Sequence, residues 1–232
     1  MSKTIGILGG MGPESTVYLF NLIVTLTRVE KDQDHIPVII YNNPKTPDRT
    51  AAIIAGGESP LPALINGAVF LEKAGADFIL MPCVTAHYFY NEIVRHIDIP
   101  FLHLIEETLA YTIRELKDIK KIGLLASAGT IRSRLFQDMF HARGFEIVVP
   151  GEEKQRLLMK ALYQEEGVKA GYKEKPREAI LRVLDHLLRQ GIEAVIAGCT
   201  EIPLVLNQSH TKVPFIDPME IVARESIRRA SI

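Results

Sequence analysis

Two cysteines, Cys83 and Cys199, are the residues of this 232-residue chain whose surroundings most clearly suggest chemistry. Each follows a short apolar run and precedes residues that can begin a helix. A thiol at a helix N-terminus faces unpaired backbone N–H groups and the positive end of the helix dipole, which stabilise the thiolate. An ordinary cysteine titrates near pH ~8.5, so modest stabilisation gives a useful thiolate fraction at neutral pH. The pair suggests proton transfer by a thiol and a thiolate.

The two cysteines occupy equivalent places in an internal repeat of about half the chain. Three segments recur in the same order, and the middle ones end on the cysteines: 4–12 with 121–129, 75–83 with 191–199, and 99–106 with 213–220. Such a repeat predicts two similar lobes. Lobes related by a pseudo-twofold axis would present the sulfurs from opposite sides of one cleft. That arrangement suits moving a proton from one face of a carbon to the other.

Cysteine pairs also form disulfides and bind zinc, and the residues favour these alternatives less. Thiols stay reduced in the cytoplasm, and the chain has no Cys-x-x-Cys motif. His87 and His103 could join two thiolates on a metal, but the usual zinc-ligand spacing is missing. We therefore expect no metal site, and we expect His87 to be a supporting residue rather than a proton carrier.

The elements that would position the cysteines alternate between short apolar runs and longer amphipathic stretches. The expected strands are 4–8, 38–41, 78–81, 101–104, 122–125, 146–149, 194–197 and 213–216. Their continuous hydrophobicity is typical of parallel strands buried on both faces. The expected helices begin at Pro13, run over 62–74 and 176–190, and end before glycines in the latter two cases.

These elements predict an α/β fold of two similar doubly wound, flavodoxin-like lobes with parallel four-stranded sheets. The predicted lobes are residues 1–104 and 105–216. The last helix, 217–232, has two candidate places, on its own lobe or back on the first. Ligands of such sheets bind beyond the carboxyl ends of the strands, where both cysteines fall.

Composition excludes several classes of protein. The chain is 47% apolar and 24% charged with a net charge of −1, so it is neither disordered nor basic enough for a nucleic-acid or anionic-membrane partner. No signal peptide and no apolar run of membrane-spanning length is visible, which predicts a cytoplasmic location.

Five segments closely resemble the cofactor-independent aspartate racemases of the aspartate/glutamate/hydantoin racemase superfamily. They are Gly9–Pro13, Asn42–Thr50, Met81–His87, Gly167–Gly171 and Ala197–Glu201. The resemblance implies two α/β lobes with the active site between them, one catalytic cysteine from each, no cofactor and a homodimer. It implies interconversion of L- and D-aspartate, with glutamate as a further candidate substrate.

The resemblance also implies residues that bind an acidic amino acid. Arg49 and Lys169 match motif positions that would hold the side-chain carboxylate, and both are suitable carboxylate partners. Further candidates line the cleft or offer hydroxyl and backbone donors: Met11, Val84, Thr85, Ser127, Gly129, Thr130, Thr200 and Glu201. Ordinary helix capping explains the hydroxyl residues equally well.

One position departs from the family pattern. Val84 stands where these racemases usually have asparagine after the first cysteine, so a side-chain donor to the substrate carboxylate is missing. A hydrogen bond to a charged group is worth ~1.5–3 kcal/mol, and its loss puts the preference for aspartate in doubt. Glu201, by contrast, follows the aspartate-racemase pattern, since glutamate racemases commonly have histidine there.

Two other functions stay open at this stage. Related superfamily members isomerise or decarboxylate other small dicarboxylates with similarly placed cysteines. A nucleotide- or acidic-ligand-binding protein without racemase activity is the alternative of a different class. Against nucleotide binding, Ser15 stands where the third glycine of Gly-x-Gly-x-x-Gly is needed, and Pro13 interrupts the turn.

Overall fold

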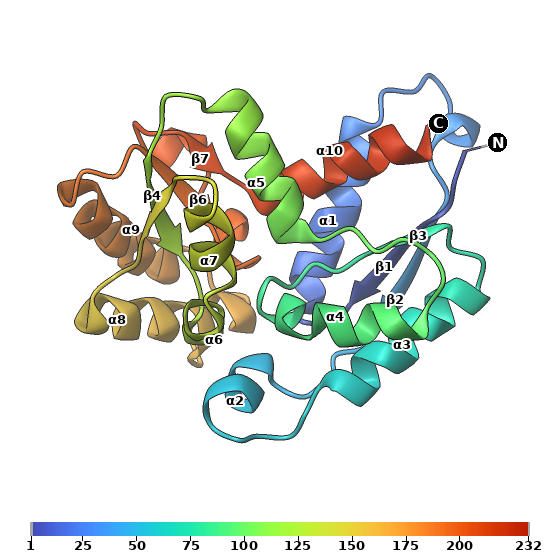
Figure 1. The fold of residues 1–232 in the computed structure, drawn as a ribbon, viewed down its shortest axis with the longest axis horizontal. Helices are drawn as coiled ribbons and strands as arrows, with labels where there is room; N and C mark the ends of the chain where they lie inside the picture. Colours follow the sequence, from blue (N-terminus) through green and yellow to red (C-terminus); the bar gives the residue numbers. More distant parts are fainter. Residues whose placement is uncertain (1, 232) are drawn as a thin grey trace. The chain divides into compact units, whose positions relative to one another are not determined.

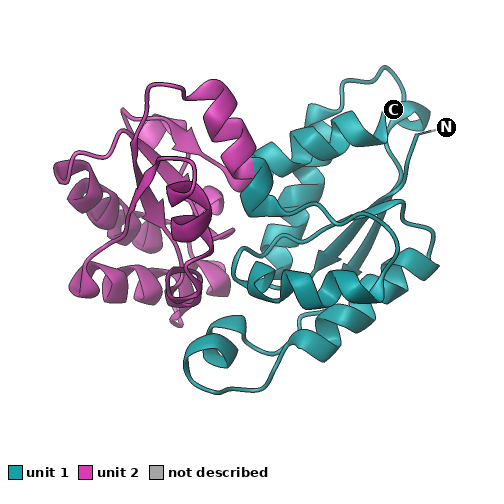
Figure 2. Cartoon of the chain, in the orientation of Figure 1, with its two compact units in different colours: residues 1–107, 219–232 teal, residues 108–218 magenta. Residues whose placement is uncertain are grey.

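A computed structural model of the protein describes residues 2–231, and the chain divides into two compact units (Figure 2). The first unit comprises residues 1–107 and 219–232, and the second comprises residues 108–218. The C-terminal helix therefore belongs to the first unit. The boundary expected at 104/105 falls at the start of one helix, α5 (Leu104–Glu115), whereas the units divide inside that helix, after Glu107.

The first unit is built on a parallel sheet with the strand order β2-β1-β3. Its strands are β1 (Ile5–Gly9), β2 (Val38–Asn42) and β3 (Phe78–Leu80). Its helices are α1 (Pro13–Leu26), α2 (Arg49–Ile54), α3 (Leu61–Lys73), α4 (Tyr90–Ile93), the start of α5, and α10 (Pro218–Ala230), and its 3₁₀ turns are η1 (Asp32–Asp34), η2 (Thr85–Phe89) and η3 (Val94–His96).

The second unit repeats this plan with a parallel sheet of order β5-β4-β6-β7. Its strands are β4 (Lys121–Leu125), β5 (Glu146–Val148), β6 (Ala194–Ala197) and β7 (Phe215–Ile216). Its helices are α6 (Ala128–Ser133), α7 (Leu135–His141), α8 (Glu152–Tyr163) and α9 (Glu174–Arg189), with 3₁₀ turns η4 (Val168–Ala170), η5 (Ile202–Leu204) and η6 (Gln208–His210). The predicted α/β fold with two parallel sheets is confirmed.

The strand order explains how helices cover both faces of each sheet. From β1 the chain passes through α1 to β2, and from β2 it passes through α3 in the reverse direction to β3. Because such crossovers are right-handed, reversing the direction moves the connecting helix to the other face of the sheet. In the first unit, α1 and α3 accordingly lie on opposite faces of the sheet (Figure 1).

The first sheet differs from the four strands that the sequence predicts. Residues 101–104 contribute a single parallel bridge between Phe101 and Ile79, whose backbone N–H donates to the Pro100 carbonyl oxygen at 2.9 Å. The equivalent bond in the second unit runs from Val195 to Pro214, also at 2.9 Å, and there a short strand follows. The pairing stops after one residue pair in the first unit, although α5 and α10 begin at equivalent positions of the repeat, Leu104 and Pro218.

A carboxylate at the start of each sheet repeats between the units. Asp77 accepts a hydrogen bond from the Thr4 N–H at 2.6 Å, just before β1. Glu193 accepts bonds from Lys120 and Lys121 at 2.7 and 2.8 Å, where β4 begins. These backbone bonds lower the pKa of Glu193. Each carboxylate thereby joins the starts of two neighbouring strands and helps to fix their register.

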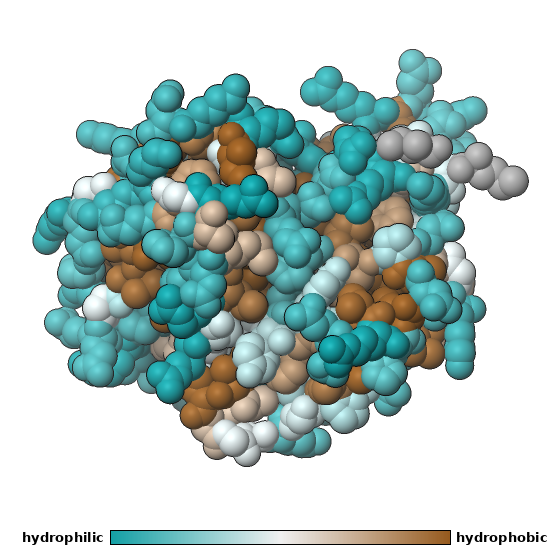
Figure 3. Space-filling model, viewed as in Figure 1, coloured by the Kyte–Doolittle hydropathy of each residue, from teal (hydrophilic) through white to brown (hydrophobic). Residues whose placement is uncertain are grey.

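Each unit has its own apolar core. In the second unit buried residues of α8, α9 and β6 form one cluster, in which Leu158, Val183 and Val195 are fully buried. On the face drawn in Figure 3, hydrophilic side chains surround patches of apolar ones. Among residues 2–231, no helix is both long and apolar enough to cross a membrane.

Gly10 makes the turn that follows β1. Its φ of +96° lies in the left-handed region, and a Cβ there would stand 2.3–2.5 Å from backbone atoms of Asn43. Its N–H donates to the Thr16 hydroxyl at 3.0 Å, which joins the turn to the first turn of α1. Only glycine fits both the backbone angle and the close approach.

We expect Gly10→Ala to destabilise the protein more than Gly56→Ala. Gly56 also has a positive φ, +64°, but a Cβ there meets nothing within 4 Å. In the Gly56 variant the free energy of unfolding should therefore fall only by the cost of a left-handed backbone, about 1–2 kcal/mol. In the Gly10 variant a clash between the new Cβ and the Asn43 backbone should lower it further. Urea denaturation of both variants measures the difference. Equal losses of unfolding free energy would show that the Gly10 turn relaxes freely.

Candidate active site

Cys83 lies in the loop after β3, where the sequence places it. Its N–H donates to the Met81 carbonyl at 2.8 Å, and the residue is 5% exposed. It belongs to the same buried apolar cluster as Met11, from the loop after β1. The residues that follow it, Val84 and Thr85, are also buried.

His87 holds the Cys83 loop against the start of α5. Its Nδ1 lies 2.9 Å from the Cys83 carbonyl oxygen, and its Nε2 accepts from the Leu104 N–H at 3.2 Å. Because a carbonyl only accepts and a backbone N–H only donates, the proton must sit on Nδ1. Burial and the neighbouring His103 lower the pKa of His87 to about 3. The imidazole is neutral and structural, as expected from the sequence.

Arg49 joins two loops of the first unit. Its guanidinium donates to the carbonyls of Thr46 and Pro47 at 3.1 and 3.0 Å, and to that of Met11 at 3.2 Å. The residue is 8% exposed and begins α2, which Asp48 caps through a 2.7 Å bond to the Ala51 N–H. Arg49 and Met11, two of the predicted binding residues, are thus in direct contact.

Cys199 lies after β6, and its thiol donates to Glu201. The Sγ–Oε2 distance is 2.8 Å, and the Thr200 hydroxyl donates to the same oxygen at 3.4 Å. The other oxygen of Glu201 pairs with the Lys169 ammonium, which η4 presents 5.3 Å from the centre of the Tyr163 ring. The fold therefore brings Lys169 to three consecutive predicted site residues, Cys199, Thr200 and Glu201, and no local sequence signal predicts the Lys169–Glu201 pair.

The sequence predicted a stabilised thiolate at Cys199, and for this arrangement of side chains that prediction is wrong. Burial, followed by the charge of Glu201, raises the pKa of Cys199 well above its usual value, and Lys169 opposes the shift only in part. The helix-dipole argument also weakens, since the elements after the cysteines are the short 3₁₀ turns η2 and η5 rather than long helices. Cys199 is a thiol in this structure.

Ser127 and Thr130 cap a helix at the carboxyl end of β4. The Ser127 hydroxyl accepts from the Thr130 N–H at 3.2 Å and lies 3.2 Å from the Thr130 hydroxyl. Gly129, between them, is buried in the first turn of α6. The capping explanation therefore holds for the Ser127 hydroxyl, and the roles of Ser127, Gly129 and Thr130 toward a ligand stay predictions.

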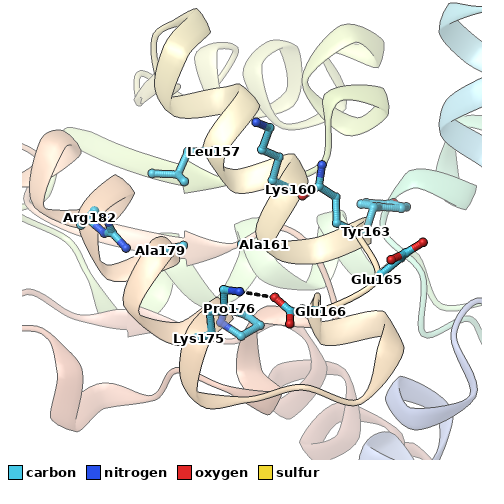
Figure 4. A pocket seen from close by; sticks show the side chains of 11 residues that line it. Leu157, Lys160, Ala161, Tyr163, Glu165, Glu166, Lys175, Pro176, Ala179 and Arg182 are labelled. Carbon is cyan, nitrogen blue, oxygen red and sulfur yellow. Dashed lines mark hydrogen bonds and ion pairs between the residues drawn. The ribbon is translucent and has the colours of Figure 1, made fainter.

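A cavity of about 710 Å³ opens between α8 and α9 (Figure 4). Its lining includes Leu157, Lys160 and Tyr163 from α8, and Lys175 pairs with Glu166 at its edge. None of the predicted site residues lines it. Within residues 2–231, no three histidine, cysteine or acidic side chains gather in a way that could hold a metal ion.

Known proteins similar to this chain agree on one family. The family model described as Asp/Glu/Hydantoin racemase matches residues 8–226. A broad-specificity amino-acid racemase of Bacillus subtilis, RacX, is 32% identical over 96% of both chains. The aspartate racemase structure from Picrophilus torridus has 32% identity and a TM-score of 0.88, covering 99% of this chain and 94% of that one. A structure of an aspartate racemase homologue from Pyrococcus horikoshii has 29% identity, full coverage of both chains and a TM-score of 0.79.

The parallel two-unit fold is shared with the aspartate racemase structures to which the chain is similar. The chain belongs to the Asp/Glu/hydantoin racemase family, so it is an isomerase that acts on amino acids. The resemblance noted in the sequence is confirmed at this level.

The buried histidines should make stability depend on pH. The pKa of His87 is about 3 and that of His103 about 4, both below the usual 6.5 because of burial. Unfolded histidines bind protons below pH 6.5 while the folded ones do not, so their contribution is present above 6.5 and is lost as pH falls toward 4. Urea denaturation between pH 4.5 and 6.5 should show a fall of several kcal/mol.

His103→Gln should flatten this dependence, whereas His96→Gln, at an exposed position, should leave it unchanged. The pH window matters because carboxylates with a lowered pKa, such as Glu225 at about 2, affect stability only below about 4.5. Because His87 still contributes, the slope should become smaller without vanishing, and an undiminished slope in His103→Gln would contradict a contribution from His103.

Proposed function

We propose that the protein racemises an acidic amino acid, aspartate before glutamate, by two-base proton transfer without a cofactor. The observation that carries the proposal is the equivalent placement of Cys83 and Cys199, each beyond the third strand of its unit, β3 and β6. The likeness to an aspartate racemase over nearly the whole chain supports aspartate as substrate. The likeness to RacX favours broad specificity as the second candidate.

In this mechanism one thiolate removes the Cα proton and the thiol of the other cysteine delivers a proton to the opposite face. The two cysteines exchange roles in the reverse direction. Removing a proton from Cα leaves an enolate-like carbanion, so the protein must stabilise negative charge on the α-carboxylate. Backbone N–H groups at Thr85, at Gly129 in the first turn of α6 and at Thr200 are suited to that task.

Arg49 and Lys169 are the proposed partners of the substrate's side-chain carboxylate. Bonds to three carbonyls hold the Arg49 guanidinium in place before substrate binds, which lowers the entropic cost of binding. Lys169 already pairs with Glu201, but an ammonium has three donors and can bind a second carboxylate.

The test is incubation of L- and D-aspartate, L- and D-glutamate and a panel of neutral amino acids in D₂O without added cofactor. We expect inversion together with deuterium incorporation at Cα for aspartate. Cys83→Ala and Cys199→Ala should each lower racemisation at least about 10³-fold, because each removes one of the two groups that transfer the proton. Optical rotation and NMR follow the two events separately.

Cα exchange without inversion in one cysteine variant would fit a single remaining base. Undiminished racemisation in Cys199→Ala would overturn the two-base mechanism. Absence of Cα exchange with the whole panel would overturn racemisation of these substrates. A preference for neutral amino acids would favour the broad-specificity alternative.

Val84→Asn should strengthen binding of aspartate. The buried Val84 side chain offers no donor, whereas an asparagine amide can donate to a carboxylate. A hydrogen bond to a charged group is worth about 1.5–3 kcal/mol, so we expect KM for aspartate to fall by roughly tenfold or more. Val84→Leu serves as the control for altered packing. Equal KM values in both variants would mean that position 84 does not contact the carboxylate.

We also propose that the protein forms a homodimer. Val17, Phe20 and Val24 are 65%, 38% and 38% exposed and recur along one stripe of α1. An apolar stripe with this spacing is typical of a helix face that packs against another surface. Sedimentation of the intact protein measures the oligomeric state directly.

A further inference from the structure

Glu201 connects two groups in a partly buried chain of polar contacts. Its Oε2 accepts from the Cys199 thiol at 2.8 Å, and its Oε1 pairs with Lys169. The Glu201 side chain is 4% exposed and that of Lys169 is 23% exposed. At such burial electrostatic interactions are stronger than in water, so each group influences the protonation of the next.

We propose that Glu201 is a positioning residue that holds the proton of Cys199, while Lys169 binds the other carboxylate oxygen of Glu201, so that Cys199 rests as the proton donor of the cysteine pair. This role replaces the substrate contact that the sequence suggested for Glu201. The donor role rests on the proposed function, whereas the contact chain stands on the geometry alone.

Delivery of the proton from Cys199 leaves a thiolate on that residue. The thiol proton leaves Sγ for Cα, the carbanion's electron pair forms the new C–H bond, and the S–H pair stays on sulfur as a thiolate. That thiolate then lies beside the Glu201 carboxylate, and the two negative charges repel. Lys169 offsets part of this repulsion. The thiolate is therefore a strong base that readily takes a proton again.

The charged groups that face Cys199 support this assignment. Glu201 approaches from the same loop and Lys169 from η4, while Tyr163 of α8 lies against Lys169. Burial and Glu201 raise the pKa of Cys199, and Lys169 acts in the opposite direction. The equivalent position in the first unit, two residues after Cys83, is the neutral Thr85. The two cysteines therefore have different chemical surroundings.

The test is a titration of the thiolate absorbance near 240 nm, which needs neither substrate nor access of a reagent to the sulfur. In Cys83→Ser only Cys199 contributes, and the Cys83→Ser/Cys199→Ser double variant provides the blank for tyrosine ionisation. Adding Glu201→Gln to Cys83→Ser should raise the thiolate-to-thiol ratio at a fixed pH about tenfold or more, because the negative neighbour is gone. Adding Lys169→Met should lower the ratio, because the positive neighbour is gone.

Opposite changes of the thiolate-to-thiol ratio in the Glu201 and Lys169 variants distinguish this proposal from a purely structural role. A general loosening of the loop would change the ratio in the same direction in both variants. Glu165→Gln, an exposed carboxylate of the same unit, should leave the midpoint unchanged. If Glu201→Gln does not fold, Glu201→Asp is the second variant. Its shorter side chain keeps the negative charge but places it farther from the Cys199 sulfur, so the thiolate-to-thiol ratio should rise as in Glu201→Gln but by less. An unchanged midpoint in the Glu201 variants, or shifts of equal sign for Glu201 and Lys169, would overturn the proposal.

The outcome is independent of the proposed racemisation. If the titration shifts as expected but no amino acid exchanges its Cα proton, the contact chain stands, while the proposed function and the donor role fail. If racemisation occurs, its alkaline limit should move to lower pH in Glu201→Gln in the chain that retains both cysteines. An alkaline limit that stays in place would overturn the donor role of Cys199.

Discussion

The parallel pairing of neighbouring strands is the constraint on which the candidate site depends. β1 pairs with β3, and β4 pairs with β6, in the same direction. Parallel strands need crossover helices, so the loops after all four strands emerge at the carboxyl edge of their sheet. Those loops contain Met11, Cys83, Ser127 and Cys199. The chemistry-bearing residues gather there because the backbone leaves regular pairing at that edge.

The two cysteines occupy equivalent positions in the two units, but different groups surround them. In the first unit a neutral histidine, His87, fixes the carbonyl of Cys83 and leaves the protonation of the thiol to its surroundings. In the second unit a carboxylate and an ammonium act on the thiol of Cys199 itself. The repeated fold thus positions both sulfurs by the same topology, while a local difference, Thr85 against Glu201, gives the two thiols different neighbours.

The sequence predicted what depends on local pattern and missed what depends on distant pairing. Continuous apolar runs located the strands, and the repeat placed both cysteines at strand ends. The strand expected at 101–104 is only a bridge from Phe101 to Ile79, and hydrophobic periodicity does not report how many residues of a run pair with a neighbouring strand. Lys169 and Glu201 stand 32 positions apart, so nothing local shows that they pair or that Glu201 meets the Cys199 thiol.

The difference between the thiols has a consequence for any two-base racemase. Such an enzyme works only when one sulfur is protonated and the other is not, and two identical thiols titrate over the same pH range. Doubly protonated and doubly ionised forms, both inactive, then compete with the working form. Raising the pKa of one thiol well above its usual value widens the pH range in which the pair holds a single proton. Enantiomers have equal free energies, so this asymmetry changes the working fraction of the enzyme and leaves the final ratio of products at one.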